Sequence, residues 1–560
     1  MEKKWWHKTV GYQIYPKSFQ DTNGDGIGDL KGVIRHLDKI EKLGANVIWL
    51  CPVFASPMVD NGYDISDYMD IDPSFGTMED MKELIAEAKK RGIRILMDLV
   101  VNHSSDRHAW FQAALKDPFG KYGKYYVFRE GKDGKEPNNW RSIFGGSAWE
   151  KVPGYDKLYY LHIFTKEQPD LNWENPKLRE EIYEMILKWM DLGLGGFRLD
   201  AISHLKKNYQ YTNLPPDGPD EYNMAFEYFN NVDGLADILC EMKERTFAPT
   251  DALTIGEYDH MGPEDVEDVI GENGSFSSVF DFCHTLDNVR NPKWGNTVAL
   301  FDDYRDQLFA AQKIVDGRGM LCNFLENHDK PRSIDRFLMP EDQNLYSEKM
   351  LPVTNFFLPG IVFLYQGQEI GMTNCHRNDI SEYDDISTKD QYQVAIDAGC
   401  TKEEALACCY ENSRDNARTP MQWSADENGG FSAHAPWLAV NPNYKEINVS
   451  EQEGRADSVL SYYKELIKLR KSPEYEETFV YGNVEPVYED TDTVFGFMRM
   501  GKENRQKILV AANYGKEAVS LPLPGTAKKL LLSNAGRRKL ADADHITLES
   551  LETAVVLLKA

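Results

Sequence analysis

The chain has 560 residues, of which 63 are Lys or Arg and 90 are Asp or Glu, giving a formal net charge of −27. This negative charge argues against nucleic acid or an anionic membrane as a partner. The length exceeds that of one simple domain and is sufficient for a barrel of about 250 residues with insertions and a further domain.

The elements predicted first along the chain alternate between strand and helix. Apolar runs at residues 10–16 and 46–52 predict the first two strands, and residues 30–43 between them place apolar side chains at helical spacing. A predicted helix at residues 79–91 then leads into a third strand that ends at Asp98. This alternation favours a parallel α/β architecture.

A long aromatic-rich and Gly-rich segment, residues 104–172, interrupts the alternation. Long loops inside a compact domain are usually functional or form small domains, so we predict an inserted subdomain. Asn175 and Pro176 then predict the start of a helix, because Asn caps helices and Pro suits their first position. A second, partly helical insertion is predicted at residues 375–414.

The later strands are predicted to end in acidic residues. The fourth ends at Asp200, the fifth at Glu257 and the seventh near Asp329, and residues 360–366 form the eighth. Beyond residue 471, short alternating runs separated by turn residues predict an antiparallel β-domain.

Two negative features predict a cytoplasmic protein. The first residues, Met-Glu-Lys-Lys-Trp-Trp, lack the apolar run of a signal peptide, and no stretch of about 20 apolar residues predicts a membrane-spanning helix. The eight cysteines are not spaced like a disulfide framework or a zinc site, so we expect reduced thiols.

Four acidic motifs, each at the end of a strand-like run, carry the functional signal: Asp98–His103, Gly196–Asp200, Thr254–Glu257 and Phe324–Asp329. The carboxyl ends of barrel strands lie on one face, where barrel enzymes do their chemistry. Two or three carboxylates there, with His and Arg beside them, are the minimum apparatus for cleaving a glycosidic bond.

These motifs, with Gln168–Asn172, resemble glycoside hydrolase family 13, the α-amylase family, over nearly the whole chain. The nearest group contains the oligo-1,6-glucosidases, α-glucosidases, dextran glucosidases and sucrose isomerases. The resemblance implies an α/β fold: a (β/α)8 TIM barrel with a subdomain inserted after strand 3 and a C-terminal antiparallel β-domain. The expected boundaries are 1–103 and 173–475 for the barrel, 104–172 for the inserted subdomain and 476–560 for a C-terminal β-sandwich.

The resemblance also implies the catalytic residues. Asp200 stands at the nucleophile position, Glu257 at the acid/base position, and Asp329 at the position of a third carboxylate that grips sugar hydroxyls. Arg198 lies two residues before Asp200, on the same side of the strand, and is expected to favour its ionised form. Ala201 directly follows the nucleophile position. In the related enzymes, Val at this position accompanies a preference for α-1,6 linkages, and Ala or Thr accompanies α-1,4 or broader specificity.

Several further positions are implied to bind the substrate. His103 and His328 are expected to hydrogen-bond the sugar, and Tyr63 to offer its ring an aromatic face. Asp60 is expected to pair with Arg418 and close the pocket behind the terminal sugar, which would limit cleavage to chain ends. Two aromatic residues of the insertion line the substrate entrance or belong to the subdomain core: Phe144 and Phe164.

Residues 21–29 place oxygen ligands at every second position, like the start of an EF-hand loop. The loop is not an EF-hand, because its twelfth position is Gly32 instead of a glutamate. The resemblance implies a structural Ca²⁺ here, with Mg²⁺ or a metal-free Asx-rich turn as alternatives. No catalytic cofactor is expected. The expected ligands are Asp21, Asn23, Asp25, the carbonyl oxygen of Ile27, and Asp29.

The resulting hypothesis is an exo-acting retaining α-glucosidase that acts on maltose, sucrose, isomaltose or isomalto-oligosaccharides. A sucrose isomerase or transglucosylase on the same residues is the alternative, in which Arg332 and Arg336 become important. A non-catalytic relative, like the heavy chains of amino-acid transporters, is a remote third reading. Linkage preference, the ratio of hydrolysis to transfer, pH optimum, metal occupancy and oligomeric state (monomer or weak homo-oligomer) stay open.

Overall fold

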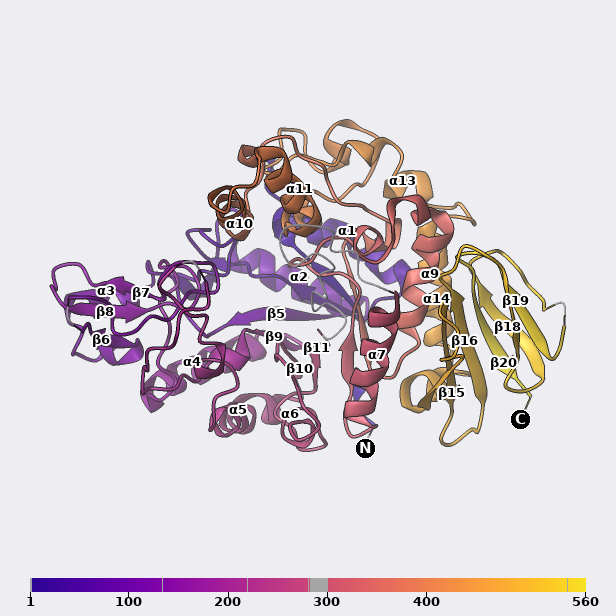
Figure 1. The fold of residues 1–560 in the computed structure, drawn as a ribbon, viewed down its shortest axis with the longest axis horizontal. Helices are drawn as coiled ribbons and strands as arrows, with labels where there is room; N and C mark the ends of the chain where they lie inside the picture. Colours follow the sequence, from indigo (N-terminus) through magenta and orange to yellow (C-terminus); the bar gives the residue numbers. More distant parts are fainter. Residues whose placement is uncertain are drawn as a thin grey trace.

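The computed structural model describes residues 3–132, 134–218, 220–280, 282, 301–540 and 542–559. Within these residues, eight parallel strands close into the predicted barrel at the centre of the molecule (Figure 1). β11, for which the sequence offered no prediction, is the sixth strand and has only three residues. The barrel strands are β1 (Val10–Ile14), β2 (Val47–Leu50), β5 (Arg94–Val100), β9 (Gly196–Asp200), β10 (Leu253–Gly256), β11 (Ser278–Phe280), β12 (Leu321–Asn323) and β13 (Ile361–Tyr365).

Local signals explain where the helices around the barrel begin and end. Asp29 caps α1 by accepting a hydrogen bond from the N–H of Gly32, and Gly44 ends it in the left-handed conformation that glycine favours. Asn175 caps α4 as predicted. The helices of the barrel and its connections are α1 (Leu30–Leu43), α2 (Met78–Lys90), α4 (Pro176–Asp191), α5 (Leu235–Met242), α6 (Val266–Val269), α7 (Phe301–Val315), α8 (Ser333–Phe337), α9 (Leu345–Phe356), α12 (Asp415–Arg418), α13 (Val449–Gln452) and α14 (Val459–Arg470).

The first insertion lies between β5 and α4, at one end of the molecule (Figure 1). Its antiparallel sheet has the order β6-β8-β7. Tyr211 and Phe229, which follow β9, pack with Trp140 and Trp149 of the insertion in one apolar cluster. The subdomain core is therefore completed by the connection after the fourth strand. The insertion contains α3 (Ala109–Lys116), β6 (Phe128–Glu130), β7 (Trp149–Lys151) and β8 (Leu158–Leu161), and a small sheet before it contains β3 (Phe54–Ala55) and β4 (Asp67–Ile71).

The C-terminal region forms the predicted antiparallel domain at the opposite end of the molecule (Figure 1). Five strands pair in the order β14-β15-β16-β20-β18, and β17 pairs with β19. Leu509 and Val556 of the first sheet share an apolar cluster with Leu521 and Leu548 of the second. The strands are β14 (Asn483–Val487), β15 (Val494–Met500), β16 (Lys507–Asn513), β17 (Val519–Pro522), β18 (Ala527–Ser533), β19 (His545–Leu548) and β20 (Thr553–Leu558).

The second insertion follows β13 and forms two helices, α10 (Ile386–Asp397) and α11 (Lys402–Asn412). Figure 1 shows them together at the top of the view. None of the helices in the described ranges is both long and apolar enough to cross a membrane.

Two buried arginines hold the turn between α9 and β13, one from α14 of the barrel and the other from β15 of the C-terminal domain. Arg470 of α14 donates to the carbonyl oxygens of Gly360, at 2.5 Å, and Leu358, at 3.4 Å. Arg499 of β15 donates to the carbonyl oxygen of Phe479 at 2.9 Å and to that of Phe357. A carbonyl group buried without a donor is costly, so these guanidinium groups stabilise the turn before β13.

We expect Arg470→Met to lower the free energy of unfolding by at least about 2 kcal/mol, because it leaves buried carbonyl groups without donors. Chemical or thermal unfolding measures the change, with the exposed Arg538→Met as the matched control. Equal stability of the two variants would contradict this role for Arg470.

Candidate active site

One buried guanidinium organises the carboxyl ends of three neighbouring strands. Arg198 Nη1 lies 2.8 Å from Asp98 Oδ1 and 2.5 Å from Asp200 Oδ1. Its Nη2 lies 2.7 Å from Glu257 Oε2. The Arg198 side chain is 1% exposed, whereas that of Glu257 is 25% exposed. The two catalytic candidates are therefore held side by side, and Glu257 is the more exposed of the two, at 25% against 11% for Asp200.

This cluster contains more carboxyl groups than positive charges. Burial raises the pKa of Asp200 well above its usual value, Arg198 opposes this shift, and Glu257 and Asp98 add to it. Three carboxyl groups around one guanidinium cannot all ionise without mutual repulsion, so the cluster retains a proton readily. An acid and a nucleophile can thus coexist in one site.

Asp98 links this cluster to the predicted substrate residues. It lies inside β5, which continues to Val100, instead of ending the strand. Its Oδ2 accepts hydrogen bonds from Trp49 Nε1 at 3.1 Å and from the Tyr63 hydroxyl at 3.0 Å. The Tyr63 hydroxyl lies 2.5 Å from His328 Nε2, and the two rings are stacked with centroids 5.3 Å apart.

His328 and Asp329 form an ion pair in the loop that follows β12, the seventh strand of the barrel. His328 Nε2 lies 2.9 Å from Asp329 Oδ2. Burial opposes protonation, but the Asp329 carboxylate raises the pKa of His328 to about 10. Burial likewise opposes ionisation of Asp329, yet His328, Arg414 and Arg418 lower its pKa well below the usual value. Asp329 is thus a permanent carboxylate, unlike the proton-sharing cluster around Arg198.

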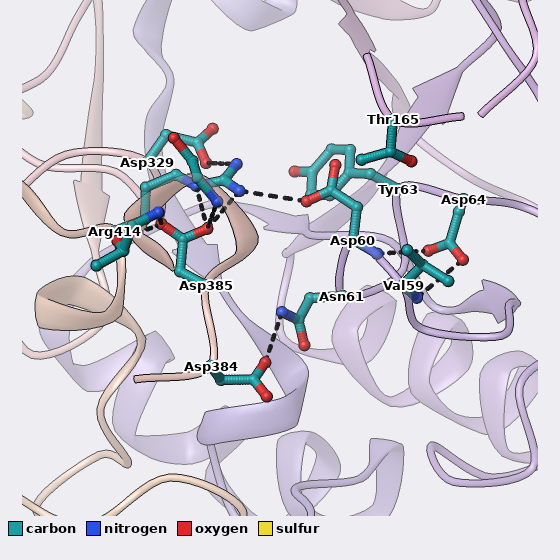
Figure 2. A network of polar contacts seen from close by, with 12 residues as sticks. Val59, Asp60, Asn61, Tyr63, Asp64, Thr165, Asp329, Asp384, Asp385 and Arg414 are labelled. Atoms are coloured by element: carbon teal, nitrogen blue, oxygen red, sulfur yellow. Dashed lines mark hydrogen bonds and ion pairs between the residues drawn. The ribbon is translucent and has the colours of Figure 1, made fainter. Parts of the chain in front are cut away.

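The predicted pairing of Asp60 with Arg418 is wrong. Arg414 Nη2 lies 3.3 Å from Asp60 Oδ1 and also contacts Asp385 Oδ1 at 2.5 Å (Figure 2). Arg418 instead holds Asp329, with 2.8 Å between Nη2 and Oδ1. The two arginines lie one helical turn apart, so the motif alone could not show which of them faces Asp60.

His103 lies against the backbone of Tyr63. Its Nε2 lies 2.9 Å from the carbonyl oxygen of Tyr63, and burial lowers the pKa of His103 to about 3, which keeps it neutral. Gln168 Nε2 donates to Asp60 Oδ2 at 3.1 Å, a contact that the sequence reasoning missed.

Phe144 and Phe164, the two aromatic residues predicted at the substrate entrance, lie together beside His103. The Phe164 ring is 5.1 Å from His103 and 5.5 Å from Phe144. Phe164 also packs against the subdomain core, and the Arg414 guanidinium lies over the Phe144 ring at 5.3 Å. Phe164 therefore belongs to the subdomain core, and Phe144 connects the first insertion to Arg414. A place at the substrate entrance stays a prediction for both residues.

Ala201 connects the two catalytic candidates through its backbone. Its φ of 47° and ψ of 36° are left-handed, which is strained for a residue with a Cβ. In this conformation its N–H donates to Glu257 Oε2 at 2.9 Å. Residues with a strained backbone are common at functional sites, where the surrounding structure keeps them in that conformation.

Residues 13–482 match the family model described as "Alpha amylase, catalytic domain". The chain belongs to the α-amylase family. This match confirms the resemblance found in the sequence and identifies the protein as a glycoside hydrolase. The chain is 41% identical over 572 residues to the oligo-1,6-glucosidase of Parageobacillus thermoglucosidasius, with 100% of both chains covered.

Two solved structures of similar proteins cover 100% of both chains. The trehalose-6-phosphate hydrolase of Bacillus licheniformis is 37% identical with a TM-score of 0.90. The isomaltulose synthase of Klebsiella sp. LX3 is 35% identical with a TM-score of 0.93.

The predicted metal loop of this α-amylase-family chain closes on itself. Asp21 accepts hydrogen bonds from the N–H groups of Asn23, Gly24 and Gly26, and Asn23 Nδ2 donates to Asp25 Oδ2 at 3.1 Å. Adjacent carboxylate and amide oxygens have the chemistry that a hard cation requires. Across the described ranges, however, no group of three or more His, Cys, Asp and Glu residues is placed to hold a metal ion. The metal stays a prediction.

The His328–Asp329 pair predicts a pH-dependent contribution to stability. Because folding raises the pKa of His328 from about 6.5 to about 10, the pair stabilises the fold fully below pH 6.5 and less as pH rises through 10. His328→Gln should therefore lower the free energy of unfolding more at pH 6 than at pH 9.5, by at least about 1 kcal/mol. Denaturant titration measures both differences, with the exposed His434→Gln as control. An equal loss at the two pH values would refute the ion pair's contribution.

Proposed function

We propose that this α-amylase-family chain is an exo-acting retaining α-glucosidase that releases glucose from short α-glucosides. The observation that supports this proposal most strongly is the sharing of Arg198 by Asp200 and Glu257, through its two terminal nitrogens. Carboxylates held this way lie close together. This matches the separation of about 5 Å in retaining glycosidases better than the separation of about 6.5 to 9.5 Å in inverting ones.

In the proposed reaction, Asp200 attacks the anomeric carbon while Glu257 gives its proton to the leaving oxygen. A covalent glucosyl ester forms on Asp200, and the leaving sugar departs. Glu257 then removes a proton from water, which attacks the ester and releases α-glucose. Asp329, paired with His328, carries a negative charge that favours the positive transition state.

The residues at the far end of the proposed pocket support exo action. Asp60, from the connection after β2, is held by Arg414, the last residue of the second insertion. Arg414 also contacts Asp329 Oδ1 at 3.4 Å, and Asp60 is only 5% exposed. These charged groups close the pocket behind one glucose, so a chain end is the part of the substrate that fits.

Neutral di- and oligosaccharides are the proposed substrates, because the relatives include enzymes named oligo-1,6-glucosidase and glucan 1,6-alpha-glucosidase. Ala201 leaves more room beside the leaving sugar than Val would, which favours a broader linkage range. One methylene in such a pocket is worth about 1–3 kcal/mol of discrimination. Isomaltose, maltose and sucrose are therefore all proposed as substrates.

Sucrose isomerisation is the second candidate, because isomaltulose synthase has the same overall fold. Arg332 does not support it: its side chain is fully buried, pairs with Glu326 at 2.9 Å and donates to the carbonyl oxygen of Gln366. Arg336, by contrast, lines a cavity of about 230 Å³ with Asp329 and Arg414. Glucose and fructose released from sucrose would indicate hydrolysis, and new glucosyl-fructose isomers would indicate isomerisation.

We expect Asp200→Asn to reduce kcat on isomaltose and maltose at least about 1000-fold, because an amide cannot replace the nucleophilic carboxylate. Its circular dichroism and unfolding midpoint should resemble those of the parent. The exposed Asp490→Asn in the C-terminal domain is the matched control and should keep full activity. Substantial residual turnover by Asp200→Asn would rule out this residue as the nucleophile.

We further propose that residues 21–29 bind a structural Ca²⁺, with ligands from Asp21, Asn23, Asp25, Asp29 and the Ile27 carbonyl oxygen. Such an ion would stabilise the loop before α1 and supply nothing to the reaction. Treatment with a chelator should lower the unfolding midpoint by several degrees, and Ca²⁺ should restore it better than Mg²⁺. Activity per folded molecule should stay constant. Metal analysis should confirm that the treated protein is free of the ion. If the unfolding midpoint is then unchanged, the proposal of a structural Ca²⁺ is wrong.

A further inference from the structure

The residue two positions after Glu257 is an aspartate whose backbone is held by two side chains. The N–H of Asp259 donates to Ser203 Oγ at 2.8 Å, and its carbonyl oxygen accepts from Asn231 Nδ2 at 2.7 Å. The Asp259 side chain nevertheless stays 32% exposed. The chain thus anchors this residue and leaves its carboxylate accessible.

The surroundings of Asp259 place it on the leaving-group side of the site. Glu257, which gives its proton to the leaving oxygen, and Lys330, which follows Asp329, both interact electrostatically with it. His204 Nε2 lies 3.9 Å from Asp259 Oδ2. The glucose pocket is closed instead by Asp60 and its partners. A charged group beside Glu257 but outside that enclosure borders the sugar that departs.

The neighbouring His260 completes this border. Its backbone is left-handed, with a φ of 52°, and its ring meets that of Phe226 at 6.1 Å. Phe226 also contacts the His204 ring at 5.9 Å. The Phe226 ring thus touches both histidines beside Asp259, His204 and His260. Aromatic and acidic groups therefore lie close together here, a combination suited to a sugar, which has both apolar faces and hydroxyl groups.

The charge of Asp259 decides which leaving groups it accepts. Burial and Glu257 raise the pKa of Asp259 to about 6, so the group is mostly ionised at neutral pH. A carboxylate accepts hydrogen bonds from sugar hydroxyl groups and repels a phosphate. The Bacillus licheniformis relative is named for a phosphorylated disaccharide, so charge on the leaving sugar is a distinction that this fold can make.

We propose that Asp259 is a specificity-determining residue that binds the hydroxyl groups of a neutral leaving sugar and rejects a leaving sugar that carries a phosphate. The proposal rests on the proposed function, because it concerns the leaving-group side of the same reaction. It narrows the substrate class to unphosphorylated disaccharides and oligosaccharides.

Two substrate pairs test this proposal: trehalose with trehalose 6-phosphate, and sucrose with sucrose phosphorylated on its fructose. The parent enzyme should prefer the neutral member of any pair that it cleaves by at least about 10-fold in kcat/KM. Asp259→Asn, which keeps the side-chain shape, should reduce that preference at least about 5-fold. The parent's preference should also weaken as salt rises from about 20 mM to about 500 mM, because salt screens a partly exposed charge.

Asp268→Asn is the matched control, because Asp268 is an exposed carboxylate farther along the same connection. It should leave the preference unchanged. A parent enzyme that cleaves the phosphorylated member equally well, or an Asp259→Asn preference equal to the parent's, would overturn the role of Asp259. An enzyme that cleaves none of isomaltose, maltose and sucrose would instead refute the proposed function, so the two failures are distinguishable.

Discussion

The active site depends on a guanidinium buried with three carboxyl groups. Burying the charge of Arg198 is costly unless Asp98, Asp200 and Glu257 all reach it. They come from the neighbouring strands β5, β9 and β10, whose pairing is set by the barrel. The closed parallel sheet therefore fixes the distance between Asp200 and Glu257, the two proposed catalytic residues. A misplaced strand would leave an unpaired charge in the core.

The rest of the pocket is assembled from connections that are far apart in the sequence. Asp60 follows β2, Asp329 follows β12, and Arg414 ends the second insertion, yet the arginine contacts both carboxylates. Phe144 of the first insertion lies under the same guanidinium. The two insertions thus meet at Arg414, beside the carboxylates that we propose close the pocket behind a terminal glucose.

Much of this arrangement could be predicted from the sequence because the strand-end motifs are local. The positions of Asp200 and Glu257 follow directly from apolar runs that end in acidic residues. β11 could not be found, since three residues carry too little periodicity. The seventh strand was expected near Asp329 but β12 ends at Asn323, because the intervening residues form a loop.

Contacts between distant segments were the least predictable part of the site. Arg414 and Arg418 have the same chemistry and lie one helical turn apart, so only the packing of α12 decides which one reaches Asp60. Arg332 shows the same limit: its sequence position suggests a substrate loop, whereas its side chain binds Glu326 and backbone carbonyl groups in the core.

The close pairing of Asp200 and Glu257 on one guanidinium predicts a retaining reaction, which the anomer of the first product tests most directly. Proton NMR during the first minutes of hydrolysis, on whichever of isomaltose, maltose or sucrose reacts fastest, resolves α-glucose from β-glucose. We expect α-glucose to appear first and the β-anomer to grow in later by mutarotation, as double displacement through Asp200 requires. β-Glucose as the first product would show single displacement by water and contradict the account.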